Sequence, residues 1–198
     1  MNEDGVKTVS LEEMTARMVR FKDLPPRPKL GAGVLPPEVI EFMTADSNYT
    51  YMAPPSEHQS RIQKYAALIG GDAGDGISVS LAVCSPGRGP ALHTHLRTVE
   101  AFFCLSGRFA IEWGPEGENS VVLEPWDFVH VPTGVERTFH NVGDVEGALL
   151  VIIQGNKNDF DDVVRPPYVG EQLTERFGPE AAAKLDQLGA KLYSGTTG

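Results

Sequence analysis

Residues 87–107 have the sequence GRGPALHTHLRTVEAFFCLSG, and this stretch decides the fold. His93 and His95 are separated by one residue, so in an extended strand both side chains lie on the same face. Glu100 follows five residues after His95 and begins the next apolar run, and hairpin-like pairing can bring its carboxylate beside both imidazoles. Two neutral imidazoles and one carboxylate suit Fe, Mn, Ni, Cu or Zn. The stretch therefore predicts a divalent metal site between short strands.

The segments on both sides of this stretch have the pattern of short β-strands. Apolar and polar residues alternate with period two over 77–83. Gly, Pro, Asp and Asn separate the runs, and no helical pattern lies between them, which excludes a parallel βαβ arrangement. This spacing predicts an antiparallel sandwich or barrel. The other predicted strands are 101–105, 109–113, 121–123, 128–131, 137–142 and 148–153.

The composition changes along the chain and predicts three parts. Residues 1–60 form an N-terminal helix and a Pro-rich arm, residues 61–155 the β domain, and residues 156–198 a loop and a helical tail. A capping box at Ser10 predicts the first helix. Apolar residues of the arm need burial on the core or on a second subunit, so we expect a homodimer in which the arms also cover exposed sheet edges. The acidic run 159–162 is expected to be a solvated loop.

Composition limits the classes of partner. The 198 residues carry a net charge of -10, and an acidic surface repels phosphate backbones, so no nucleic-acid partner is expected. The longest apolar run, Ala148–Ile153, is far too short for a membrane span, and no membrane partner is expected. The polar N-terminus does not resemble a signal peptide. Cys84 and Cys104 are too few for a disulfide scaffold, so we expect a cytoplasmic protein with buried, unreactive thiols.

The quoted stretch resembles the first motif of the cupin superfamily, G-x5-H-x-H-x(3,4)-E-x6-G. Every fixed position is met at the family spacing, by Gly87, His93, His95, Glu100 and Gly107. The resemblance covers about 76–155 and implies an all-β fold, a double-stranded β-helix (jelly-roll) barrel with its site at the mouth. The N-terminal arm and the C-terminal helices lie outside it.

Residues 126–141 resemble the second cupin motif, G-x5-P-x-G-x2-H-x3-N, with two departures. The proline, second glycine and asparagine are kept as Pro132, Gly134 and Asn141. Trp126 stands where the family has its first glycine, and Arg137 stands where the family has the His that is its fourth metal ligand. These departures put the fourth ligand in doubt.

Arg137 leaves two alternatives open. An arginine is always protonated and cannot ligate a metal. Either Arg137 pairs with Glu100 and the metal is lost or weak, or Glu100 still ligates and Arg137 holds an anionic substrate group as a catalytic residue. In the second case the two-His, one-carboxylate set resembles the facial triad of non-haem iron oxygenases. His130 is a candidate replacement ligand, whereas strand alternation sends His140 to the opposite face from Arg137.

Three functions remain open at this stage. The first is a metal-binding cupin with dioxygenase-like or isomerase-like activity on a small anionic organic substrate, with His93, His95 and Glu100 as ligands. The second is a metal-free small-molecule-binding cupin, a sensor or storage protein, with a Glu100–Arg137 ion pair inside the barrel. The third is a metal-independent epimerase or isomerase in which His93 or His95 is the base.

Overall fold

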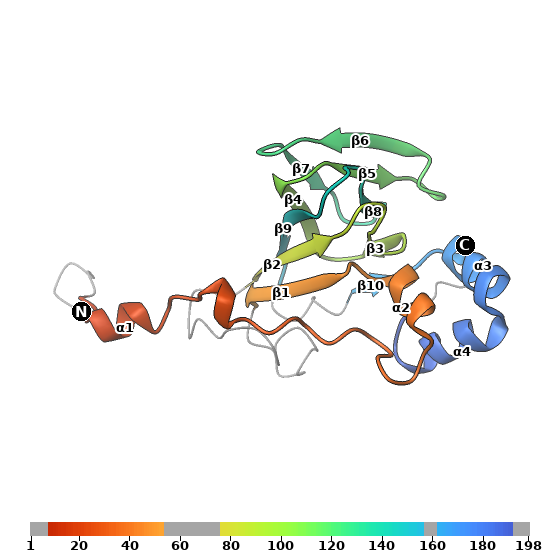
Figure 1. The fold of residues 1–198 in the computed structure, drawn as a ribbon, viewed down its shortest axis with the longest axis horizontal. Helices are drawn as coiled ribbons and strands as arrows, with labels where there is room; N and C mark the ends of the chain where they lie inside the picture. The colour runs from red at the N-terminus through yellow and green to blue at the C-terminus, as the bar shows by residue number, and fades with distance from the viewer. Residues whose placement is uncertain (1–7, 54–75, 157–161, 192–198) are drawn as a thin grey trace.

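Two five-stranded antiparallel sheets form the barrel (Figure 1) in a computed structural model that describes residues 8–53, 76–156 and 162–191. The first sheet has the order β1-β2-β9-β4-β7 and consists of Ser47–Met52, Ile77–Cys84, Gly147–Gln154, Val99–Ser106 and Phe128–Val131. The second sheet has the order β10-β3-β8-β5-β6 and consists of Val163–Val164, His93–His95, Glu136–Asn141, Phe109–Trp113 and Asn119–Leu123. The predicted all-β jelly-roll fold is confirmed, and each predicted strand overlaps an observed one.

The core between the two sheets is built from the side chains that point inward from the strands of both sheets. Phe102 and Phe109 are completely buried, and each lies edge-on to Phe139 with ring centroids 5.3 and 6.2 Å apart. Each fully buried aromatic side chain contributes about 1.5–3 kcal/mol of hydrophobic stabilisation. Cys84 and Cys104 belong to the same core, as predicted, and burial raises the pKa of Cys84 to about 11. Both thiols are therefore packing groups.

Three short helices form a second core beside the barrel. They are α2 (Pro37–Met43), α3 (Pro167–Phe177) and α4 (Pro179–Gln187), and each begins with a proline in its first turn. Their apolar faces meet in one buried cluster that includes Val39, Leu173 and Leu185. The apolar residues of α2 are thus covered by the C-terminal helices of the same chain.

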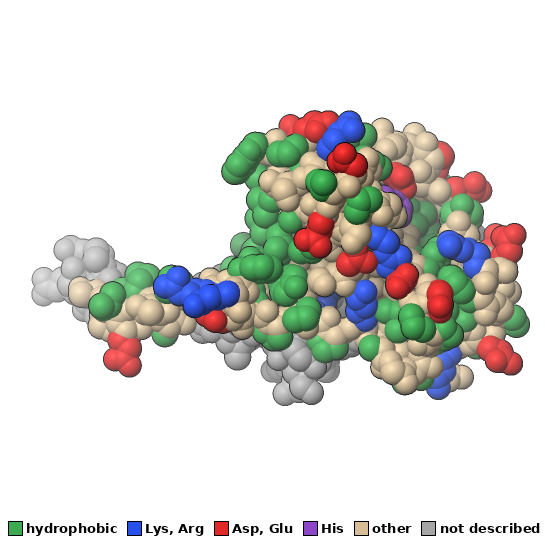
Figure 2. Space-filling view, viewed as in Figure 1, with side chains coloured by type: hydrophobic (Ala, Val, Ile, Leu, Met, Phe, Trp, Pro, Cys, Tyr) green, Lys and Arg blue, Asp and Glu red, His purple; other side chains and the backbone are tan. Residues whose placement is uncertain are grey.

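The N-terminal helix α1 (Leu11–Thr15) projects away from the barrel (Figures 1 and 2), whereas the 3-10 turn η1 (Phe21–Asp23) lies against β1, with the Phe21 and Tyr49 ring centroids 4.8 Å apart. The predicted capping box is present: the Glu13 N–H donates to Ser10 Oγ at 3.1 Å, and the Ser10 N–H donates to Glu13 Oε2 at 2.6 Å. Leu11 is 85% exposed and Met14 is 56% exposed. The apolar side of α1 therefore faces solvent.

Segments from both flanks join the sheets. β1 comes from the N-terminal part and pairs with β2, while β10 comes from the C-terminal part and pairs with β3. The predicted boundary near residue 60 lies outside the described residues. None of the helices in the ranges that the structure describes is long and apolar enough to cross a bilayer.

Candidate metal centre

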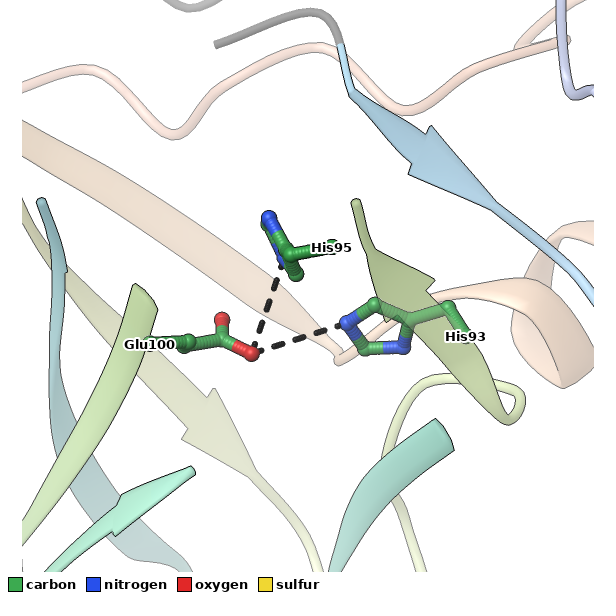
Figure 3. A group of neighbouring side chains, drawn as sticks. All are labelled: His93, His95 and Glu100. Carbon is green, nitrogen blue, oxygen red and sulfur yellow. Dashed lines mark ion pairs between the residues drawn. The ribbon is translucent and has the colours of Figure 1, made fainter. Parts of the chain in front are cut away.

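The predicted triad converges inside the barrel (Figure 3). β3 presents His93 and His95 on one face, and β4 brings Glu100 toward them. Glu100 Oε2 lies 3.7 Å from His93 Nε2 and 3.6 Å from His95 Nε2. All three residues are buried, and their candidate ligand atoms lie within 4.8 Å of one another. The predicted convergence is present, but hairpin pairing does not produce it: β3 and β4 belong to different sheets, and the side chains meet between the two sheets.

Both imidazoles are held by their Nδ1 atoms. His93 Nδ1 lies 3.0 Å from the carbonyl oxygen of Ala91, which can only accept, so Nδ1 carries the hydrogen. His95 Nδ1 lies 2.8 Å from Thr98 Oγ1 and 3.1 Å from Asp162 Oδ1. The Thr98 hydroxyl donates to Asp162 Oδ2 at 2.9 Å, so its oxygen is free to accept from His95. A neutral imidazole in this setting directs the lone pair of Nε2 toward Glu100 in both cases.

Asp162 was expected in a solvated acidic loop, and for this residue that expectation is wrong. Its carboxylate is buried and accepts hydrogen bonds from the backbone N–H groups of Arg97 and Thr98 at 2.8 and 2.7 Å. Burial alone would raise its pKa, but the hydrogen bonds from His95 and these two amides hold the pKa well below its usual range. The residue precedes β10 and lies 67 positions from His95, so no local sequence pattern could have revealed the contact.

Arg137 lies on β8 directly opposite His93 in the strand register, and its side chain is completely buried. Its Nε donates to Glu100 Oε2 at 3.0 Å and its Nη1 donates to the Val135 carbonyl at 2.8 Å. Nη2 is buried without a hydrogen-bond partner in the described part of the chain. The ion pair foreseen between Glu100 and Arg137 is therefore present, beside the two imidazoles rather than away from them.

Burial and neighbouring side chains set the protonation states of Glu100 and His93. Burial would raise the pKa of Glu100, but His95, His93 and Arg137 outweigh it and lower the pKa to about 2. Burial lowers the pKa of His93 despite the opposing effect of Glu100. Glu100 is therefore a carboxylate and His93 a neutral imidazole near pH 7, which are the forms that bind metal ions.

A cavity of about 190 Å³ opens onto the triad. Arg27, Asn48 and Ser78 border it from the N-terminal side of the chain, and Val163 and Arg165 border it from the C-terminal side. His93, His95 and Glu100 line it, whereas Arg137 does not. Both flanking segments thus contribute walls to the cavity at the candidate metal centre.

His130 and His140, the two histidines in the region of the second motif, lie away from the triad. His130 is exposed on β7 and does not join the triad. His140 points to the outer face of β8, as predicted, where its Nδ1 lies 3.2 Å from Glu112 Oε2. That pair borders a separate cavity of about 630 Å³ between the outer face of the barrel and α2 and α3, to which no triad residue contributes.

Two motif positions that carry no candidate metal ligand, Gly107 and Trp126, have a left-handed backbone conformation. Gly107 has φ of +79°, and a Cβ there would lie 2.7 Å from Gly147 Cα, so the turn requires glycine. Trp126 has φ of +80° and is the only non-glycine residue with positive φ in the described ranges. A side chain thus occupies a left-handed position where the second motif has glycine.

Comparison with known protein families gives a match to the cupin domain over residues 80–153. Residues 80–153, which contain most of the barrel, are therefore similar to a cupin domain. The match contains the triad and Arg137, whereas Asp162 and Arg165 lie beyond the matched segment. The cupin domain accounts for most of the two sheets but not for β1, β10 or the helices.

Two curated proteins are similar to this chain. The putative mannose-1-phosphate guanylyltransferase of Vibrio cholerae serotype O1 is 25% identical over 128 residues, which cover 65% of this chain and 26% of that protein. The quercetin 2,3-dioxygenase of Bacillus subtilis (strain 168) is 24% identical over 134 residues, which cover 63% of this chain and 39% of that protein. The chain therefore spans well under half the length of either relative.

Solved structures with similarity include a Cupin 2 conserved barrel domain protein from Salinispora arenicola. It is 16% identical, with a TM-score of 0.39, over 55% of this chain and 74% of that chain. The capsular polysaccharide assembling protein CapF from Staphylococcus aureus is 17% identical, with a TM-score of 0.41, over 56% of this chain and 26% of that chain.

Proposed function

We propose that this protein is a metal-dependent cupin enzyme that acts on a small anionic organic molecule by dioxygenase-like or isomerase-like chemistry. His93, His95 and Glu100 would hold one divalent ion, for which Fe, Mn, Ni, Cu and Zn all suit the ligand set. One observation carries the proposal: two Nε2 atoms and a carboxylate oxygen face one another while both Nδ1 hydrogens are engaged elsewhere.

These residues fit a metal ion on electrostatic grounds. Two imidazole lone pairs directed at a carboxylate repel it; Arg137 on Glu100 Oε2 offsets part of this repulsion, and a cation between the three ligand atoms would remove the rest. A proton on one imidazole would also relieve the repulsion, but burial lowers the pKa of His93 and opposes a proton there. A bound divalent ion would supply Lewis-acid or redox chemistry to an oxygen-bearing substrate. The oxidative option is supported by the relative named quercetin 2,3-dioxygenase.

Arg137 has a separate part in the proposal. The second-motif resemblance gives it the place of the fourth ligand, where it contributes a charge instead of a lone pair. Its Nε on Glu100 Oε2 fixes the carboxylate and offsets part of its charge. Because Arg137 does not border the cavity, we propose that it acts without direct contact, by neutralising Glu100 and so weakening the repulsion between this carboxylate and an anionic substrate.

Elemental analysis of the purified protein tests the metal site. We expect a full equivalent of a transition metal in the wild type and almost none in the His93→Ala/His95→Ala double variant. His140→Ala is the matched control, because its imidazole lies on the outer face of the barrel, and it should keep the metal. If the wild type stays free of metal after incubation with each candidate ion, the enzyme proposal fails.

A metal-free binding module is the second candidate, and the 3.0 Å contact between Arg137 and Glu100 favours it. The Arg137→His variant separates the two functions because it adds a fourth potential ligand and removes the ion pair. A metal affinity that rises at least about tenfold, or about 1.4 kcal/mol, would indicate a weak native site and favour the binding module. An unchanged affinity would favour the enzyme.

A further inference from the structure

Arg165 lies in the wall of the cavity that contains the proposed metal ligands. It directly follows β10, whose Val163 pairs with His95 in the strand register, so sheet pairing fixes where this segment runs. On its other side, the Arg165 N–H donates to the Lys191 carbonyl at 3.0 Å. The position of Arg165 beside the cavity is therefore set by the fold at two points.

Within the part of the chain that the structure describes, no carboxylate pairs with the guanidinium of Arg165. Its Nε is buried and has no hydrogen-bond acceptor within residues 8–53, 76–156 and 162–191. Burial lowers the pKa of Arg165 to about 10, and no carboxylate opposes this effect. Burying a cationic group without a partner costs free energy, and such groups in proteins are normally paired. An anion in the cavity would supply the missing acceptor.

The charges around the cavity have the opposite sign to the molecule as a whole. The chain has a net charge of -10, yet among the described residues the cavity is bordered by Arg27, Arg165 and one acidic residue, Glu100. Asn48, Ser78 and Ser80 add neutral polar groups to its lining. A locally cationic cavity in an acidic protein attracts small anions to this place on the molecule.

We infer that Arg165 binds the carboxylate of a small organic substrate next to the metal ligands. This inference rests on the proposed function, which makes the bound molecule a substrate, and it specifies that the substrate is a carboxylate. A guanidinium matches a planar carboxylate in bidentate geometry. The volume of about 190 Å³ lies below the roughly 300 Å³ at which drug-sized sites begin, so the molecule is small.

Anion binding by metal-stripped protein tests the inference without any contribution from a metal. Pyruvate and malonate are titrated against the full chain by calorimetry, beside their neutral amides pyruvamide and malonamide and beside inorganic phosphate. We expect at least one of the two carboxylates to bind, and its neutral amide to bind with an affinity at least about tenfold lower. The Arg165→Gln variant should bind the same carboxylate with an affinity about tenfold lower than the wild type does. Arg108→Gln is the matched control, because it removes an exposed arginine that pairs with Glu124 away from the cavity.

Thermal unfolding of the ligand-free variants provides a second readout that a purely structural arginine would not give. Removing a half-buried guanidinium whose Nε has no described acceptor should raise the Tm of Arg165→Gln by about 2–4 °C while the carboxylate affinity falls. A lower Tm, equal carboxylate affinity in wild type and variant, tighter binding of phosphate, or no carboxylate binding to the wild type would each overturn the inference. Metal content is measured separately, so a wild type without metal would remove the enzyme proposal and leave the anion result interpretable.

Discussion

Replacing Asp162 with Asn tests whether the proposed metal centre depends on how His95 is oriented. Asp162 Oδ2 accepts from the Arg97 and Thr98 amides, while Oδ1 faces His95 Nδ1 at 3.1 Å. An asparagine can keep its oxygen at the two amides and place its NH2 group against His95. Two donors would then face each other, and His95 would move its hydrogen from Nδ1 to Nε2. The nitrogen directed at Glu100 would no longer offer a lone pair.

The expected loss follows from this change of tautomer. Outer-shell partners of ligating histidines contribute about 10–100-fold in metal affinity, which corresponds to about 1.4–2.7 kcal/mol. We expect Asp162→Asn to lose this much affinity for Zn²⁺ or Mn²⁺. The free energy of unfolding should fall by only about 1 kcal/mol, because charge-assisted hydrogen bonds become neutral ones without being lost.

Competition titration with a chelator measures the affinity, and nitrogen-15 NMR of the imidazole identifies the tautomer of His95 without metal. Asp46→Asn is the control: its carboxylate also accepts a backbone N–H, from Ser85 at 2.6 Å, and pairs with Arg88, but it does not touch the triad. Equal metal affinity in wild type and Asp162→Asn, or an unchanged His95 tautomer, would refute the orientation argument.

Three further predictions concern acid stability, backbone strain and assembly. The pKa of Glu100 is lowered to about 2, so its contribution to stability is present above the unfolded value of 4.5 and is lost as the pH falls toward 2. Unfolding titrations should show this loss in wild type and not in Glu100→Gln. Trp126→Gly and Trp126→Ala both lose the edge-on contact with Phe103, but only glycine removes the left-handed strain, so the free energy of unfolding of the glycine variant should exceed that of the alanine variant by about 1 kcal/mol. Light scattering should detect a homodimer that dissociates when residues 1–24, with the exposed apolar side of α1, are deleted; a wild-type monomer at micromolar concentration would contradict the homodimer.

Much of the barrel could be predicted because its signals are local. Alternation over 77–83 gives β2 directly, since every second side chain of a strand faces the same side. The convergence of His93, His95 and Glu100 was predictable for a related reason: two ligands share one strand and the third starts the next. Fixed spacing within a short segment leaves little freedom for such residues to separate.

The remaining site residues could not be predicted because their contacts are distant in sequence. Asp162 and Arg165 belong to a charged segment next to a proline pair, a composition that also describes exposed loops. What places Asp162 beside His95 and Arg165 at the cavity is β10, a pairing of two residues with β3 that is too short to show any periodicity. Only the assembled sheet reveals that this segment runs along the cavity.

The candidate metal ligands and the charged residues of the cavity wall come from different parts of the chain. The residues that could hold a metal lie on central strands of the cupin domain, where strand pairing fixes them. The residues that give the cavity its charge and size, Arg27 and Arg165, come from outside the matched segment. Under the proposed function the barrel holds the metal and the flanking segments select the substrate, so similarity confined to the barrel does not identify the substrate. On this reasoning, exchanging the flanks between two cupins should transfer anion preference and leave metal affinity with the barrel.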